Sequence, residues 1–188
     1  MKKCLVVLCF LIIGQSAFAQ DIPEKRKFDH PKFSTDWLGH EFALNVDYDK
    51  FTDTTTVQVT IRLQGNSNLL IPPSLSLLAY FVYQGKEVSI PDRVLITFLS
   101  NSKGWSHLHT KRVIFLINGE RLDIGPLHRS RSLGRGSVTE SLSKYIPLNT
   151  FLRIITSASV EGQLGASNFQ LSHPQLEALR DFASHMHF

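Results

Sequence analysis

The chain has 188 residues and a formal net charge of +4 at pH 7. Its two cysteines, Cys4 and Cys9, both stand in an N-terminal segment that has the features of a cleaved leader. Once this segment is removed, the chain has no cysteine, which excludes disulfides, thiolate metal sites and cysteine nucleophiles. A chain of this length predicts one ordinary domain, which its hydrophobic core must stabilise.

Residues 1–19 have the anatomy of a secretory signal peptide. A lysine pair precedes an apolar run that ends at Ile13, and Ala17 and Ala19 supply the small residues of a cleavage site. The apolar run is too short to span a bilayer and no second long one follows, so we expect no transmembrane segment. We predict cleavage near Ala19 and export to the periplasm or the medium. The chain has no N-x-[ST] sequon, which favours a bacterial source.

Residues 20–40 are polar and interrupted by two prolines, so we expect a leader that is partly disordered. Residues 41–188 have the pattern of a single domain built mainly of strands. Residues 54–65 give the clearest strand, because their period of two predicts one buried face and one solvated face. The side chains expected to be buried there are those of Thr55, Val57, Val59, Ile61 and Leu63.

Several later segments also predict strands. Residues 75–85 are nearly continuously apolar, which favours a central strand covered on both faces over a buried helix. Residues 92–104 give another strand. Two strand-like runs then flank Asn118-Gly119, and this dipeptide predicts a hairpin with a type I′ turn. Residues 137–146 alternate again and predict a further strand.

The C-terminal part predicts two helices. Residues 148–158 place apolar side chains on one helical face, although their isoleucine pair and threonines leave a strand possible. Ser172 and Gln175 form a capping box before a second helix, whose apolar stripe should dock on a sheet. The stripe comprises Leu176, Leu179, Phe182, Ala183 and Met186. We therefore predict a mainly-β domain, on the border of all-β and α+β: an antiparallel β-sandwich or half-open barrel of about seven strands with one or two C-terminal helices.

Basic residues concentrate between positions 103 and 144, where eight of them accompany three acidic residues. This asymmetry predicts one basic surface. At its centre, "HRSRSLGRG" (128–136) has the composition of a loop whose guanidinium groups can bind phosphate, sulfate or carboxylate. The candidate anion-binding residues are Arg129, Arg131, Arg135, Lys111, Arg112 and Lys144. The alternative is a solvated connection between strands that binds nothing.

His107 and His109 form an H-x-H pair just before a predicted strand. If residues 105–109 extend into that strand, both side chains point to one face and supply half of a metal site. The pair is similar to the H-x-H of the cupin β-barrels, but Lys111 and Arg112 stand where cupins place a glutamate. We therefore expect exposed histidines and no metal. The alternative is a histidine-ligated metal-dependent enzyme, either cupin-like or a hydrolase.

No P-loop, nucleophile elbow or distinct carboxylate pair stands out in the sequence. We therefore expect a non-enzymatic binding or structural domain without a cofactor. The expected partner is an acidic glycan, lipopolysaccharide or another envelope protein, which contacts the basic surface or pairs with an edge strand. Nucleic acid is not expected, because aromatic residues are not interleaved with the arginines.

Overall fold

The computed structural model of this chain describes residues 28–30, 33–35, 40–63, 65–66, 74–87, 89–105, 107, 109–134 and 137–186. The predicted signal peptide, most of the predicted leader and Arg135 lie outside these residues. Within them, no helix is both long enough and apolar enough to cross a membrane.

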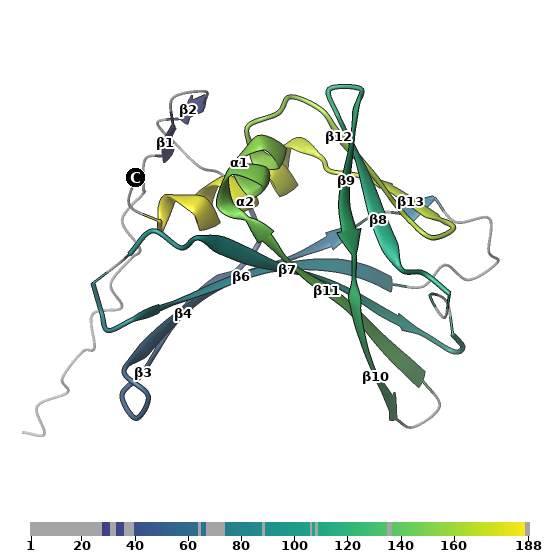
Figure 1. Ribbon diagram of the computed structural model, residues 1–188, viewed down its shortest axis with the longest axis horizontal. Helices are drawn as coiled ribbons and strands as arrows, with labels where there is room; N and C mark the ends of the chain where they lie inside the picture. The colour runs from purple at the N-terminus through teal and green to yellow at the C-terminus, as the bar shows by residue number, and fades with distance from the viewer. Residues whose placement is uncertain are drawn as a thin grey trace, which may run out of the picture.

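The larger of the two main sheets has six strands, each antiparallel to its neighbours. In spatial order they are β10 (His128–Gly134), β11 (Ser137–Pro147), β7 (Arg93–Ser102), β6 (Ser74–Gln84), β4 (Thr54–Leu63) and β3 (Leu44–Asp49). Figure 1 shows them as a twisted layer with both helices on one side. The sheet is open, so β3 and β10 are its two edges.

One face of this sheet, called here the inner face, is buried. The five side chains of β4 that were expected to be buried are at most 4% exposed, which confirms the predicted alternation. In β6 only every second residue is buried, so the prediction of a strand covered on both faces is wrong. The intervening residues Leu78, Tyr80 and Val82 lie on the opposite, outer face and stay partly exposed, because the helices and the second sheet pack on the inner face.

The smaller sheet lies over the inner face and has five strands, one of which is only two residues long. In order they are β5 (Gly65–Asn66), β13 (Ser167–Gln170), β12 (Val160–Leu164), β8 (Arg112–Ile117) and β9 (Glu120–Pro126). β8 and β9 form the predicted hairpin, and Asn118 and Gly119 have φ angles of 51° and 84°, as a type I′ turn requires. A separate hairpin consists of β1 (Phe28–His30) and β2 (Phe33–Thr35).

Two helices, α1 (Leu148–Ile155) and α2 (His173–Ser184), complete the cover of the inner face (Figure 1). The ring of Phe182 in α2 meets that of Phe81 in β6 edge-on, with centroids 5.1 Å apart. The Ser172 backbone N–H donates to Gln175 Oε1 at 2.8 Å, which confirms the predicted helix start. The Gln175 amide in turn donates to the Arg62 carbonyl of β4 at 2.5 Å. These contacts fix α2 on the larger sheet.

The polar residues Glu177 and Arg180 of α2 are buried together. The Arg180 guanidinium pairs with Glu177 at 2.5 Å and donates to the carbonyls of Ile155 and Ser157 at 2.8 and 3.2 Å. These carbonyls belong to the end of α1 and the turn after it, so the arginine satisfies a helix C-terminus and balances its partial negative charge. The buried ion pair therefore joins the two helices.

The structure confirms the predicted fold class: a mainly-β domain with two antiparallel sheets, not closed, and two short C-terminal helices. It has more strands than the about seven expected. Short or polar segments such as β10, β12 and β13 also form strands. Their backbone groups pair with a neighbouring strand, and this pairing does not require an apolar run.

Gly162 of β12 lies opposite Phe169 of β13. A methyl group on Gly162 would overlap the ring of Phe169, which packs against Phe98 and Phe115 in the core. We expect Gly162→Ala to lower the free energy of unfolding by about 1–3 kcal/mol, measured by urea denaturation. Gly104→Ala is the matched control, because nothing lies within 4 Å of the added carbon there. Equal stability of the two variants would contradict this packing.

Candidate functional site

The predicted basic segment is an edge strand and not a loop. Residues 128–134 form β10 and pair along their whole length with β11, so the loop predicted over residues 128–136 is wrong for the described part of that segment. The prediction failed because serine, arginine and glycine are common in loops. An edge strand can carry the same residues, since it pairs on one side only and can stay solvated.

Arg129 and Arg131 point to the inner face of the sheet. Arg129 lies opposite Leu142 and Arg131 lies opposite Glu140, and both partners on β11 are completely buried. Residues directly opposite each other in antiparallel strands share a face. Arg131 is nevertheless exposed and Leu133 is 72% exposed, so the cover of the inner face ends before β10. We call the inner-face positions of β10, with Trp105 beside them, the basic edge.

An aromatic ring, and not a carboxylate, holds Arg131. Its guanidinium carbon lies 5.4 Å from the ring centroid of Trp105, a residue that is 40% exposed. The ion pairs within the described residues do not include Arg131. Stacking of this kind contributes about 0.5–1 kcal/mol at an exposed site and leaves the N–H donors of the guanidinium available.

Two other candidate cations lie near the basic edge. Lys144 is on the inner face of β11, the next inward position after Leu142, with its ammonium beside Gly125 of β9. The carbonyl of Lys111 accepts the Leu127 N–H at 2.8 Å, which puts the Lys111 backbone beside the connection from β9 to β10. Arg135 lies outside the described residues. The candidates Arg129, Arg131, Lys111 and Lys144 therefore gather around one end of the molecule.

Arg112 belongs to a different surface. It lies on the outer face of the smaller sheet, where its guanidinium pairs with Asp123 at 3.1 Å. The Gly125 backbone N–H and this guanidinium hold the pKa of the Asp123 carboxyl below its ordinary range. Arg121 also lies 3.6 Å from the same carboxylate. This carboxylate therefore partly neutralises both arginines.

The two candidate metal-ligating histidines do not converge. His107 is 1% exposed, whereas His109 is exposed. The Thr110 N–H donates to the His107 carbonyl at 3.0 Å, so the chain turns here and β8 begins only at Arg112. The condition on which the metal site depended, a strand that extends over residues 105–109, is therefore not met. The expectation of exposed histidines holds for His109 and is wrong for His107. No cluster of three or more metal-ligating side chains occurs among the described residues.

A buried polar row leads from the core to the basic edge. Ser100 of β7, Glu140 of β11 and Arg131 of β10 are direct cross-strand neighbours on the inner face. The Glu140 carboxylate accepts the His107 backbone N–H at 2.9 Å. This hydrogen bond anchors the segment before β8 on the sheet and so positions Trp105 beside Arg131. The row was not predicted from the sequence, although Glu140 in an inward position of an alternating strand was a signal of it.

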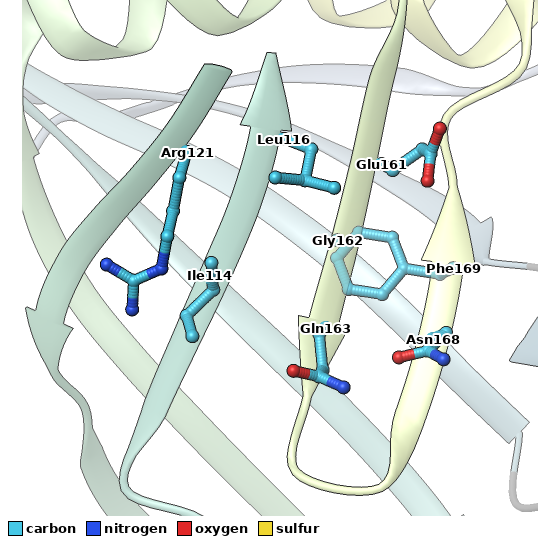
Figure 2. Close-up of a pocket in the computed structure, with 8 residues that line it drawn as sticks. All are labelled: Ile114, Leu116, Arg121, Glu161, Gly162, Gln163, Asn168 and Phe169. Atoms are coloured by element: carbon cyan, nitrogen blue, oxygen red, sulfur yellow. The ribbon is translucent and has the colours of Figure 1, made fainter. Parts of the chain in front are cut away.

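The smaller sheet carries a groove of about 400 Å³ on its outer face (Figure 2). Side chains from four strands line it: Arg121 of β9, Ile114 and Leu116 of β8, Glu161 and Gln163 of β12, and Asn168 of β13. The groove combines one cation, one carboxylate, two amides and two aliphatic side chains. Its mixed charge does not favour an anion.

A second cleft, of about 450 Å³, opens on the outer face of the larger sheet. Tyr80 and Tyr145 line it, together with Ile90 and Arg93 from the β6–β7 connection and the start of β7. The Arg93 guanidinium carbon lies 4.6 Å from the Tyr145 ring centroid. The cleft contains two tyrosines that a planar ligand could stack on, but Arg93 already covers the ring of Tyr145.

No family model, no curated protein and no solved structure matches this chain.

The stability of the folded protein at acid pH depends on His107. Burial lowers the pKa of its ring below the ordinary value of 6.5, and the nearby Glu140 charge only partly opposes this. The unfolded chain therefore binds more protons than the folded chain as the pH falls through that value. Stability is fully present above the ordinary pKa and declines below it.

We expect His107→Gln to flatten the fall of the melting temperature between about pH 7.5 and about pH 5. The measurement is thermal unfolding followed by circular dichroism across this range. His109→Gln is the control, because His109 is exposed and its replacement should leave the slope unchanged. Parallel profiles for the wild type and His107→Gln would show that His107 does not carry this pH dependence.

Proposed function

We propose that this chain is an exported, non-enzymatic bacterial envelope protein that binds a polyanionic saccharide, such as an acidic glycan or lipopolysaccharide, at the basic edge. The observation that carries the proposal is the exposed Arg131 guanidinium, stacked on Trp105 and outside the ion pairs of the described residues. The signal-peptide pattern of residues 1–19 supports export.

The chemistry of the basic edge suits a chain of anionic groups. A guanidinium presents a planar fork of donors that matches a sulfate, phosphate or carboxylate. Arg129 and Arg131 stand two residues apart on one face, a spacing of about 7 Å along an extended strand. Lys144 adds a third cation on the same face of the neighbouring strand. The exposed part of the Trp105 ring offers an apolar surface for a sugar ring.

Binding of heparin as a polyanion probe tests the proposal. We expect Arg131→Ala to weaken binding about ten- to hundredfold, because it removes a charge-assisted hydrogen-bonding group worth about 1.5–3 kcal/mol. The affinity of Arg131→Lys for heparin should lie between those of the wild type and Arg131→Ala, because lysine keeps the charge but loses the planar fork of donors. Titration calorimetry at several salt concentrations measures both effects, and the affinity should fall as salt rises.

Arg121→Ala is the matched control for this experiment. It removes the same charge from the outer face of the smaller sheet, where Arg121 lies near Asp123. If both alanine variants weaken heparin binding equally, the heparin is attracted by the overall positive charge of the protein. That result would overturn the basic edge as the binding site. Lipopolysaccharide in place of heparin then separates the two sources of anionic groups.

A further inference from the structure

The two edges of the larger sheet are both exposed. Residues 45–49 of β3 are exposed, as are most residues of β10. Among the described residues, β3 pairs only with β4 and β10 only with β11. Each edge therefore presents a row of backbone N–H and C=O groups to solvent, which is a template for another strand. Neither described edge strand contains proline or lysine, the residues that most often block such pairing.

The two edges have opposite charge. The hairpin of β3 and its turn, residues 44–53, contains three acidic residues and one lysine. β10 contains two arginines and a histidine and no acidic residue. Each edge also exposes apolar surface on the inner face: Val46 is 49% exposed, Tyr48 36% and Leu133 72%. The opposite ends of one sheet are therefore complementary in charge and similar in their apolar content.

The topology allows the two edges to meet as antiparallel strands. The sheet has six strands, each antiparallel to the next, so β3 and β10 run in opposite directions. Consider a second copy that continues the sheet and keeps its inner face on the same side. Its β10 then lies beside β3 of the first copy and runs antiparallel to it. We propose that β3 of one copy pairs with β10 of the next, so that the chain assembles head to tail into a continuous sheet.

One register matches all six residues of β3. It places Leu44 opposite Leu133, and Tyr48 opposite Arg129, an aromatic ring against a guanidinium. On the outer face the same register places Asp49 opposite His128, a carboxylate against an imidazole. Each of these cross-strand pairs is of a favourable kind.

Pairing of identical edges is disfavoured. Two β3 strands would put Asp47 and Asp49 of both copies on the same face of neighbouring strands, and two β10 strands would do the same with Arg129 and Arg131. Like charges at these distances destabilise a sheet. The contact is therefore heterologous, and a heterologous contact repeats from copy to copy until a ring closes or a filament grows.

Two half-blocked variants test the proposal. Val46→Lys with Asp47→Lys blocks β3, because both lysines would face the cationic strand of the neighbour. Ser130→Asp with Arg131→Glu blocks β10 in the same way. The measurement is sedimentation velocity at increasing protein concentration. We expect the wild-type chain to change from a monomer to species larger than a dimer. Each variant alone should stay monomeric, because its blocked edge repels the native edge of a second copy. An equimolar mixture should gain mass again, because each variant supplies the native edge that the other lacks.

Thr60→Lys with Asp92→Lys is the matched control for the β3 variant, with the same charge change at exposed positions away from the edges. It should assemble like the wild type. A wild-type chain that stays monomeric up to millimolar concentration overturns the proposal, as does dimerisation of either variant by itself. The β3 variant keeps the basic edge intact, so its heparin binding reports on the proposed function independently of assembly.

Discussion

The inner face of the larger sheet has to be covered, and the cover is narrower than the sheet. The helices and the smaller sheet bury most of the inward side chains of β4, β6, β7 and β11. They cover the two edge strands only in part. Leu44 of β3 packs against the core, whereas the inward residues Val46 and Leu133 remain exposed. Burial of apolar surface stabilises the central strands, so their inward side chains are mostly apolar. The edge strands stay in contact with water and can carry charged side chains without the cost of burying a charge.

Because the cover is incomplete at the edges, the side chains on the inner face become more polar from the centre of the sheet toward β10. One row on the inner face runs from Leu75 through Ser100 and Glu140 to Arg131, from apolar core to exposed cation. The buried Glu140 is compatible with this position because it accepts a backbone hydrogen bond from His107 and lies next to an arginine on the adjacent strand. A carboxylate deeper in the core would lack both.

Local patterns made the centre of the fold predictable. The alternation of β4, the Asn118-Gly119 turn and the cap at Ser172 each follow from the conformations of a few neighbouring residues. β10 was not predictable in this way, because its pairing depends on β11 and its arginines need no burial. The placement of Trp105 was not predictable either, since it depends on a hydrogen bond between residues 33 positions apart.

The stack of Arg131 on Trp105 gives the protein an optical reporter of its own. Trp105, one of the two tryptophans of the chain, belongs to the basic edge. Its indole is partly exposed, so its emission responds to water and to the charge that lies over the ring. An anion that draws the guanidinium off the indole, or a neighbouring strand that shields it, changes that emission. Fluorescence of the unlabelled chain therefore follows events at this edge, and a Trp37→Phe variant isolates the emission of Trp105.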